Sequence, residues 1–453
     1  MYNNFDVKRG WVLLRRDYDR ASALGAFSRR EYPTKLLFKT MQKYTYVIIG
    51  GGIAGTTAAE TIRKNDPSGK IAIVSDEKHP LYSRVLLSKP GWVTGDMPFE
   101  NVWLKPAEWY TENDIHLFKG IRAEKLNVDQ KRVHLSDGDS LQYDKLLLAT
   151  GAHNRPWDVK GADKKGIHYL RTVDDAKGIQ KLVDSEPKHV VMIGSSCVSF
   201  EIMEILIEAG HSVTEVMREK HFFEPNLSPE GVKPLRQSLD EHGVEVIAEA
   251  EVEEVLGEGF VAGVRLTNGR VIDCDAVLAF IGVVLPLDWV KDAGIATKKG
   301  IIANQYLETN VPDVYTAGDT TENWDSALGE TVIMGDWMSA RLQGELAGKN
   351  MTGAREAYSQ VSFHTSHGFG HKIGWTGDVR PKADRTIIHI PIENDETDHC
   401  RIIVWHGRII GGTTVNRPDL MSTITKLIKR KVDVSDKLEG LADGSIDLKS
   451  LVA

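Results

Sequence analysis

Two segments of this chain share one pattern, in which a buried strand runs into a glycine-rich turn and then a helix. The first, Tyr46 to Gly55, reads YVIIGGGIAG, and the second, Val190 to Glu201, reads VVMIGSSCVSFE. In the first, Gly50 permits the tight turn, Gly52 lets backbone N–H groups approach a pyrophosphate, and Gly55 lets the helix pack close to the strand. The sequence therefore predicts two dinucleotide-binding units, and so two cofactors brought face to face.

The surroundings of the first motif favour a nucleotide site over a simple turn. A second apolar strand, Ile71 to Val74, follows it and ends in Ser75, Asp76 and Glu77. An acid at about 20 residues from the turn is suited to accept hydrogen bonds from ribose hydroxyls. We therefore expect Asp76 or Glu77 to contact the nucleotide.

The second motif keeps the first glycine, Gly194, but has Ser196 and Ser199 at the second and third positions. Each serine adds a side chain where backbone or phosphate should come close, so one interpretation is a relic that binds nothing. Serine hydroxyls also hydrogen-bond phosphate, and we favour weakened binding. Residues 133–151 and 264–282 repeat one layout of a strand, a hairpin turn, a second strand with an acid, and an apolar strand closing on glycine, which supports a duplication.

The composition is that of a globular enzyme. With 453 residues the chain can hold two or three domains, and its formal net charge of −8 argues against a nucleic-acid partner. No apolar run approaches the roughly 20 residues of a membrane span. The three cysteines, Cys197, Cys274 and Cys400, are far apart and lack paired spacing, which favours the cytoplasm and gives no sign of a redox-active disulfide.

Residues 1–40 differ from the rest, with several arginines among acidic and tyrosine residues and no apolar leader segment. Their acidic residues argue against a targeting peptide. We expect an N-terminal extension that is disordered or not part of the natural product.

Further motifs follow the first turn in a fixed order. They are PLYSRVLLSK at 80–89, LATG at 148–151 and TNVPDVYTAGD at 309–319. From residue 41 on, nearly the whole chain therefore resembles the FAD-dependent pyridine nucleotide reductases of the ferredoxin/rubredoxin reductase and apoptosis-inducing-factor type. The resemblance implies an α/β fold with two Rossmann-like domains and a smaller α+β C-terminal domain. The implied boundaries are 41–165 and 285–353 for FAD, 166–284 for NAD(P), and 354–453 for the C-terminal domain.

The resemblance also assigns cofactor contacts. Asp319 would hold the ribityl chain of FAD and precede a helix at about 335–349; the alternative is an ordinary helix cap. The FAD positions that the resemblance implies are Gly50, Gly52, Ile53, Ala54, Gly55, Asp76, Glu77, Arg84, Lys89, Ala123, Ala149, Thr150, Gly151, Arg171, Gly318, Asp319 and His364. The NAD(P) positions that it implies are Gly194, Ser195, Ser196, Cys197, Glu201, Glu219 and Gly282.

Two of these residues are the catalytic candidates. The resemblance places Lys89 beside the flavin N5 and Glu201 beside the nicotinamide. A Lys89–Glu201 pair would hold both rings in register for hydride transfer, and the other interpretation is a surface ion pair. The flavin-facing segment lacks the cysteine of the family's disulfide-reducing branches, so we exclude disulfide chemistry.

Three histidines near the start of the C-terminal part invite a metal interpretation. His364, His367 and His371 could share a metal only on a helix, which Gly368 and Gly370 interrupt, so we expect a loop near the flavin and no metal. His364 also falls where relatives often have a tryptophan that shields the flavin.

From about residue 354 the sequence predicts strands, a hairpin turn at 405–408 and an amphipathic helix over 421–431. This part resembles the third domain of rubredoxin reductases and of the flavoprotein part of assimilatory nitrite reductases. The helix carries a basic run that is either a docking face for an acidic electron carrier or a solvated face, namely Lys426, Lys429, Arg430 and Lys431.

These features together predict an oxidoreductase in which NAD(P)H reduces FAD and the electrons pass to a separate acceptor such as rubredoxin or ferredoxin. Glu219 aligns with the acid that binds NADH in the apoptosis-inducing-factor type, which favours NADH over NADPH. Two alternatives stay open. The chain could be the flavin subunit of a nitrite reductase, or a redox-signalling flavoprotein that responds to NADH without rapid turnover.

Overall fold

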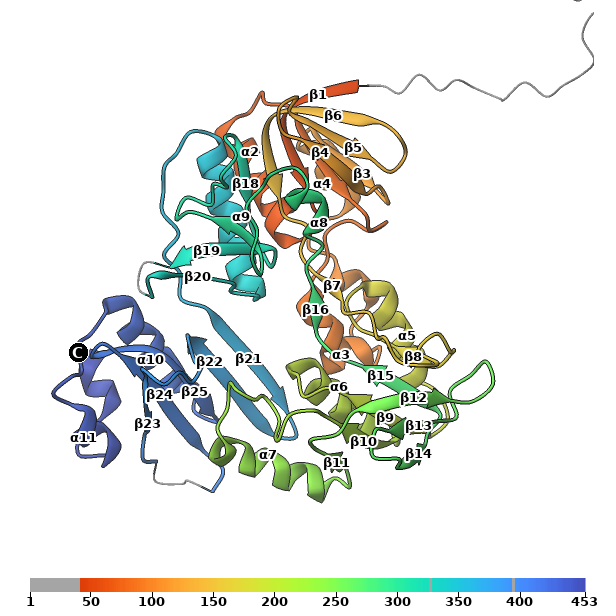
Figure 1. Ribbon diagram of the computed structural model, residues 1–453, viewed down its shortest axis with the longest axis vertical. Helices are drawn as coiled ribbons and strands as arrows, with labels where there is room; N and C mark the ends of the chain where they lie inside the picture. The colour runs from red at the N-terminus through yellow and green to blue at the C-terminus, as the bar shows by residue number, and fades with distance from the viewer. Residues whose placement is uncertain (1–40, 326–327, 393–395, 453) are drawn as a thin grey trace, which may run out of the picture. The chain divides into compact units, whose positions relative to one another are not determined.

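The computed structural model describes residues 41–453, except 326–327, 393–395 and 453 (Figure 1). The expectation for residues 1–40 lies outside this range. Among the described residues, none of the helices combines the length and apolarity that a membrane crossing requires.

The first sheet, parallel at its centre, carries the first glycine-rich motif. Its strand order is β3-β2-β1-β6-β5-β4, with β18 beside β6; β4, β5 and β6 pair antiparallel, and the other neighbours pair in parallel. The strands are β1 (Met41–Ile49), β2 (Ile71–Ser75), β3 (Ile115–Lys119), β4 (Ala123–Asn127), β5 (Arg132–Leu135), β6 (Ser140–Leu148) and β18 (Val314–Thr316). All residues of β2 are buried, as expected for a parallel strand covered on both faces. Helices α2 (Ile53–Asn65) and α9 (Trp337–Met351) pack closely, which Gly344 permits because it lacks a Cβ. A Cβ at this position would collide with the carbonyl of Ala54.

The second parallel sheet has the order β11-β10-β9-β15-β8 and carries the second motif. Its strands are β8 (Ile167–His168), β9 (His189–Ile193), β10 (Ser212–Val216), β11 (Glu245–Ile247) and β15 (Ala276–Ala279). The associated helices are α5 (Val173–Val183), α6 (Cys197–Glu208) and α7 (Pro229–Glu241). A separate antiparallel meander follows, with β12 (Val252–Leu256), β13 (Gly263–Leu266) and β14 (Val271–Asp273).

The C-terminal sheet is antiparallel, in the order β21-β22-β25-β24-β23 (Figure 1). Its strands are β21 (Phe363–Gly368), β22 (His371–Gly377), β23 (Thr386–His389), β24 (His399–Trp405) and β25 (Arg408–Val415). Helix α10 (Pro418–Arg430) buries its apolar side against this sheet, and α11 (Leu438–Ala442) and the 3-10 helix η3 (Leu448–Val452) end the chain. The predicted hairpin turn and amphipathic helix are thereby confirmed, as is the α/β fold with two Rossmann-like sheets and a smaller C-terminal part.

Shorter elements connect these sheets. They are η1 (Arg84–Ser88), α3 (Pro90–Val93), η2 (Phe99–Val102), α4 (Ala107–Glu112), β7 (His153–Asn154), β16 (Val283–Val284), α8 (Asp288–Lys291), β17 (Ile301–Ala303), β19 (Thr321–Asp325) and β20 (Glu330–Val332). Strand β7 lies where the chain leaves the first sheet for the second, and β16 lies where it returns. The two strands pair antiparallel. The domain boundaries predicted above remain a proposal.

The two parallel sheets repeat one detail of backbone geometry. Gly50 has φ +122° and Gly194 has φ +117°, and a Cβ at either position would overlap a carbonyl oxygen, of Ala149 and Phe280 respectively. The predicted repeat differs in another detail. In the first copy, residues 133–151, the second and third predicted strands are one continuous strand, β6. In the second copy, residues 264–282, the corresponding strands β14 and β15 are separate.

One buried carboxyl group has no partner among the described residues. Glu215 of β10 is 0% exposed, and neither of its carboxyl oxygens accepts a hydrogen bond. Val213 and Met217, on the same face of the strand, belong to the apolar core. Desolvation, and then the Glu219 carboxylate, raise the pKa of Glu215 well above its ordinary value.

Replacing Glu215 with leucine should therefore stabilise the protein, and more so at higher pH. The raised pKa means that stability is lost as pH rises from the ordinary pKa of glutamate, about 4.3, towards the pKa of the folded state. Removing a buried group that makes no hydrogen bond should raise the free energy of unfolding by about 1–3 kcal/mol. Thermal unfolding at pH 5 and pH 8 measures the gain, and Glu253→Leu, at an exposed site, is the control. An equal gain at both pH values would contradict this account.

Candidate active site

A cavity of about 650 Å³ opens at the carboxyl ends of the central strands of the first sheet. The first sheet, helix α6 and strand β21 of the C-terminal sheet all contribute residues to its lining. Most sequence-predicted FAD residues are among them, namely Gly50, Gly52, Ile53, Ala54, Asp76, Glu77, Arg84, Lys89, Ala149, Thr150, Gly151, Arg171, Gly318, Asp319 and His364. Gly55 packs behind the turn, where a Cβ would meet the Gly50 carbonyl. Ala123 lies in β4 and does not line the cavity.

The start of helix α2 faces this cavity without a side-chain cap. Gly52 is the N-cap residue, and no side chain accepts the first backbone N–H groups of the helix. A Cβ on Gly52 would meet nothing within 4 Å, so open space adjoins the helix start. Free N–H groups at the positive end of a helix bind a phosphate, and the site therefore fits the pyrophosphate of a dinucleotide.

Two ion pairs join predicted FAD residues along the wall of the cavity. Arg84 forms an ion pair with Glu77, and Arg171 Nη2 lies 3.0 Å from Asp319 Oδ2. Arg84 Nη1 also donates to the Arg171 carbonyl at 2.6 Å, so the two pairs are linked. Tyr82, which the sequence did not single out, donates its hydroxyl hydrogen to Glu77 Oε2 at 2.5 Å.

Helix α9 lies close to the predicted 335–349, but Asp319 does not cap it. Strands β19 and β20 intervene before α9, so the helix does not follow Asp319 directly, and Asp336 rather than Asp319 caps it by accepting from the Ser339 N–H at 2.7 Å. Asp336 Oδ2 and Trp337 Nε1 are buried without a hydrogen-bond partner among the described residues, and both residues line the cavity. A buried acceptor and a buried donor without hydrogen bonds suit the polar edge of a ligand such as FAD, and the ring of His364 lies 3.9 Å from the Asp336 oxygen.

Lys89 and Glu201 meet at the edge of the cavity. Lys89 Nζ donates to Glu201 Oε1 at 2.6 Å, and the Glu201 side chain is 4% exposed, so the surface ion pair is excluded. Two serines also donate to this carboxylate, Ser88 to Oε2 at 2.5 Å and Ser366 to Oε1 at 3.0 Å. Sequence reasoning missed both serines. Ser88 could have been suspected as the neighbour of Lys89, but Ser366 gave no signal.

Cys197 is a thiol beside the same carboxylate. Desolvation, and then the charge of Glu201, raise its pKa to about 12. Cys197, Cys274 and Cys400 are all free. A thiol held protonated is a poor nucleophile, which agrees with the absence of a disulfide-reducing motif from the sequence.

The second glycine-rich turn is built differently from the first. Ser196 caps α6 with its own side chain, accepting from the Ser199 N–H at 3.3 Å, and Ser199 donates to the Ser196 carbonyl at 2.8 Å. Ser195 donates to Glu219 Oε2 at 3.0 Å. Gly282 has φ +90° and open space where a Cβ would lie. The start of α6, where the second motif predicts a nucleotide, therefore has part of its backbone N–H groups satisfied by the chain itself.

The three histidines lie on a β-hairpin, so the expected loop is wrong. His364 is in β21, where its ring stacks on Trp375 with centroids 5.1 Å apart, and burial lowers its pKa against the opposing effect of Asp336. His371 lies in β22 and contacts Ser238 at 2.9 Å. Among the described residues, no three His, Cys, Asp or Glu side chains are grouped to hold a metal ion.

In comparisons with known proteins, this chain is similar to ferredoxin reductases and to part of a nitrite reductase. The ferredoxin–NAD(+) reductase component of the biphenyl dioxygenase system of Paraburkholderia xenovorans is 28% identical over 90% of this chain and 98% of its own length. The nitrite reductase [NAD(P)H] of Bacillus subtilis is 26% identical over 87% of this chain. The aligned region covers only 48% of the length of that nitrite reductase. The crystal structure of the ferredoxin reductase for the CYP199A2 system of Rhodopseudomonas palustris superposes with a TM-score of 0.82 and 27% identity, covering 90% of this chain and all of the other.

The sequence profile of one family spans both parallel sheets, matching residues 44–344. That family implies FAD and NAD(P)H as cofactors, and the cavity described above has the open helix start and paired charges that a dinucleotide needs. The chain belongs to the pyridine nucleotide-disulphide oxidoreductase family, and within it is a ferredoxin reductase-like oxidoreductase.

Proposed function

We propose that this oxidoreductase passes electrons from NADH through FAD to a separate small carrier protein of the ferredoxin or rubredoxin kind. The observation that carries the proposal is the Lys89–Glu201 pair, because it joins the wall of the predicted FAD cavity to the N-terminal part of α6, the helix of the second nucleotide motif. FAD, when bound, supplies a ring that takes up a hydride from NAD(P)H and passes the electrons on.

The chain's own residues bind and orient the two cofactors in this proposal. The open start of α2 holds the FAD pyrophosphate, and Asp319 accepts from the ribityl hydroxyls through the carboxylate oxygen that Arg171 leaves free. Lys89 and Glu201 fix the flavin and nicotinamide rings relative to each other, which is how positioning contributes to hydride transfer. The free thiols suit the reducing conditions of the cytoplasm.

NADH should be preferred to NADPH because Glu219 would accept ribose hydroxyls and repel a 2′-phosphate. The neighbouring Arg218, whose guanidinium lies 3.7 Å from the Glu219 carboxylate, would attract a 2′-phosphate. Its side chain is 70% exposed, so this attraction should be weaker than the repulsion by Glu219. We expect Glu219→Ala to reduce the ratio of kcat/KM for NADH to that for NADPH about tenfold, since a hydrogen bond to a charged group is worth about 1.5 kcal/mol. The measurement is kcat/KM with each nucleotide. Equal values for both, unchanged by the substitution, would remove the argument.

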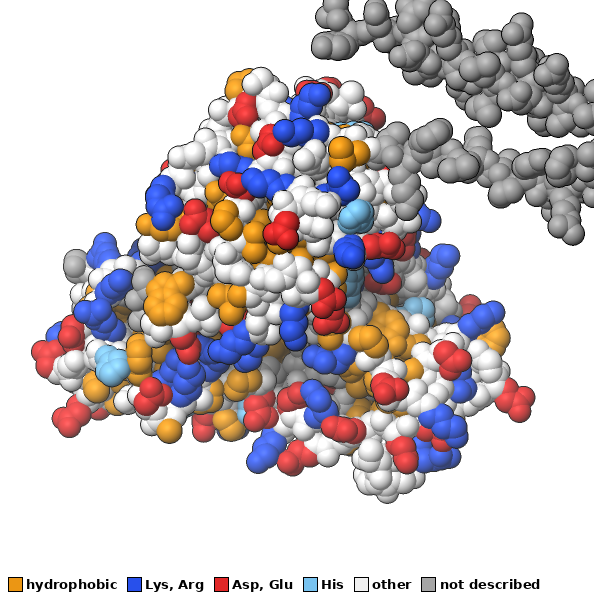
Figure 2. Space-filling view, turned by 45° about the horizontal axis from the view of Figure 1, so that its top comes forward, with side chains coloured by type: hydrophobic (Ala, Val, Ile, Leu, Met, Phe, Trp, Pro, Cys, Tyr) orange, Lys and Arg blue, Asp and Glu red, His pale blue; other side chains and the backbone are white. Residues whose placement is uncertain are grey.

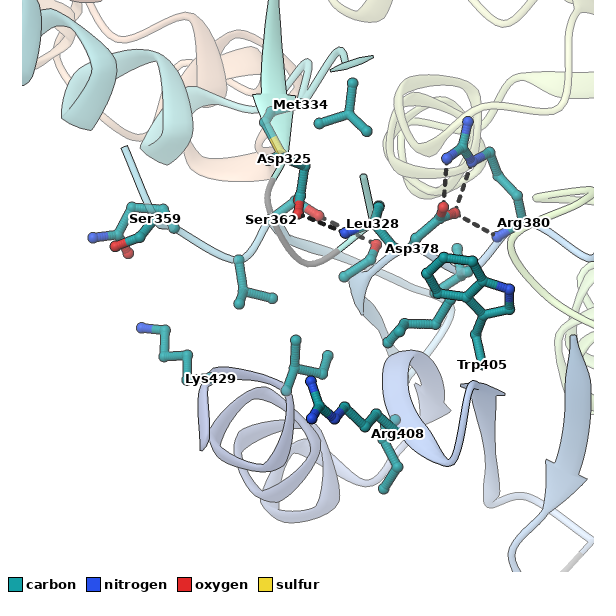
Figure 3. Close-up of a pocket in the computed structure, with 18 of the residues that line it drawn as sticks. Asp325, Leu328, Met334, Ser359, Ser362, Asp378, Arg380, Trp405, Arg408 and Lys429 are labelled. Carbon is teal, nitrogen blue, oxygen red and sulfur yellow. Dashed lines mark hydrogen bonds and ion pairs between the residues drawn. The ribbon is translucent and has the colours of Figure 1, made fainter. Parts of the chain in front are cut away.

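A second cavity of about 880 Å³ offers a docking place for the carrier. Arg408, Lys429 and Lys431 line it, and none of the three forms a salt bridge within the described part of the chain. Figure 3 shows Arg408 and Lys429 facing Asp325 and Leu328 across the opening. Figure 2 shows Lys and Arg side chains gathered beside a hollow in the visible face. These cations and the apolar lining suit an acidic carrier.

His364 lines this second cavity as well as the predicted FAD cavity. Its ring and the stacked ring of Trp375 therefore form part of the wall between the two. A carrier bound in the second cavity would lie close to the reduced flavin. Of the predicted basic run, Lys429 and Lys431 line the cavity and Lys426 and Arg430 do not.

Anaerobic reduction by NADH or NADPH, followed by a panel of acceptors, tests the proposal. We expect a yellow protein that NADH bleaches and that ferredoxin or rubredoxin reoxidises rapidly. The rate with an acidic carrier should fall as salt rises, while the rate with a small neutral acceptor should not. Failure of NADH and NADPH to bleach the protein would contradict the function itself.

The same panel separates the alternatives. The nitrite reductase of Bacillus subtilis is about twice as long as the matched region, so a flavin subunit feeding a separate reductase is the second candidate. Reoxidation only by such a reductase would favour it. Slow reoxidation by every carrier would favour the redox-signalling alternative.

A further inference from the structure

The carboxylate of Glu201 is held from two directions. Ser88 and Lys89 belong to the segment that lines the predicted FAD cavity, whereas Ser366 comes from β21 of the C-terminal sheet, 165 residues away in sequence. Ser366 is 3% exposed, so its hydroxyl has little access to water as another partner. The C-terminal sheet thus supplies a side chain to the place where the two nucleotide units meet.

The atoms involved give Ser366 a specific role. Lys89 and Ser366 both donate to Oε1 of Glu201, and Ser88 donates to Oε2. The terminal torsion of a glutamate is soft, so the carboxylate turns freely unless its partners fix it. With Ser366 in place, Oε1 lies between an ammonium and a hydroxyl group, which defines the plane of the carboxylate.

The hairpin that carries Ser366 is anchored by other contacts. The Phe369 N–H donates to Glu204 Oε1 at 2.5 Å, and His371 Nε2 lies 2.9 Å from Ser238 Oγ of α7. Gly368 packs against the ring of Phe200, where a Cβ would come within 2.9 Å. Removing the Ser366 hydroxyl therefore leaves the hairpin in place; it frees the Glu201 carboxylate and ends the contact of that hydroxyl with the Cys197 thiol.

We propose that Ser366 is a positioning residue for the nicotinamide half of the reaction, acting through Glu201. The proposal rests on the function proposed above. It gives the C-terminal sheet a part in the reduction of the enzyme by NADH, in addition to any part in meeting the electron acceptor.

Stopped-flow reduction by NADH, without any acceptor, tests the proposal. In Ser366→Ala we expect the limiting rate to fall about tenfold, as for loss of one hydrogen bond to a charged group, with the NADH dissociation constant unchanged. Flavin content, measured by absorbance, should stay at one FAD per chain. Ser366→Thr keeps a hydroxyl and should recover most of the rate. Ser366→Asp sets a second carboxylate against Glu201 and should reduce more slowly than Ser366→Ala.

Two controls separate positioning from general loosening of the hairpin. Ser238→Ala removes another hydroxyl contact of the same hairpin without touching Glu201, and should reduce at the normal rate. In a Glu201→Ala background, Ser366→Ala should cause no further loss, because the two residues act as a unit. A normal limiting rate in Ser366→Ala, an equal loss in Ser238→Ala, or a full additional loss in the double variant would each overturn the proposal. The unmodified protein is measured alongside, so its failure to be reduced would instead contradict the proposed function.

Discussion

Reduction of the bound flavin by NADH should slow about 100-fold when Lys89 is replaced by alanine, because a misplacement of about 1 Å can cost that much in rate. The ammonium of Lys89 lies 2.6 Å from Glu201 Oε1, and that carboxylate is almost fully buried. Without Lys89 the carboxylate loses its counter-charge, and the two rings lose the pair that orients them. FAD retention should change far less than the rate, because the phosphate contacts are elsewhere.

Glu201→Ala should slow the reduction similarly, and the double variant should lose much less than the product of the two single losses. Lys105→Ala is a matched control, since Lys105 is 25% exposed against 21% for Lys89 and pairs with Glu60 outside the cavity. Stopped-flow traces of the five proteins provide the measurement. Fully multiplicative losses would mean that Lys89 and Glu201 act independently.

Gly52→Val should give a folded but largely colourless protein. The Gly52 φ of −74° is open to any residue, and a Cβ there meets nothing within 4 Å, so the fold tolerates the change. The added side chain would occupy the space in front of α2 and displace the pyrophosphate from the helix N–H groups. Loss of two charge-assisted hydrogen bonds should weaken FAD binding by about 100-fold or more.

Two other glycines make this test specific. Gly91 also has open space at its Cβ position but lies outside the cavity, so Gly91→Val should keep its flavin. Gly50→Val should fail to fold, because its side chain would overlap the Ala149 carbonyl. FAD content by absorbance and secondary structure by circular dichroism separate these outcomes. A fully yellow Gly52→Val protein would contradict the assignment of the first motif to FAD.

The fold could be predicted because local signals agreed with each other. The glycine at the end of β1 and the buried run of β2 each indicate a Rossmann-like sheet, and the hairpin turn before Arg408 indicates the antiparallel C-terminal sheet. The histidine segment was misjudged because Gly368 and Gly370 read as a loop. Gly368 instead ends β21, and Phe369 and Gly370, both with positive φ, form the turn to β22.

Contacts between residues far apart in the sequence were harder to predict than the local motifs of the site. Lys89 and Glu201 could be paired because each stands in its own recognisable motif. Ser366 could not, because nothing in its neighbourhood marks one serine of a strand as the partner of a carboxylate 165 residues earlier. The β19–β20 hairpin after Asp319 was missed for a similar reason, since its short strands have no strong apolar alternation.

The starts of α2 and α6, the two helices at which the glycine-rich motifs predict a nucleotide, differ in how far their backbone N–H groups are already satisfied. Helix α2 begins at Gly52 with no side-chain cap, while α6 begins at Ser196 with its own hydroxyl already accepting a backbone N–H. A phosphate at α2 competes only with water, whereas a phosphate at α6 competes with the protein. The first arrangement suits a prosthetic group that stays through many turnovers. The second suits a co-substrate that must dissociate once in each.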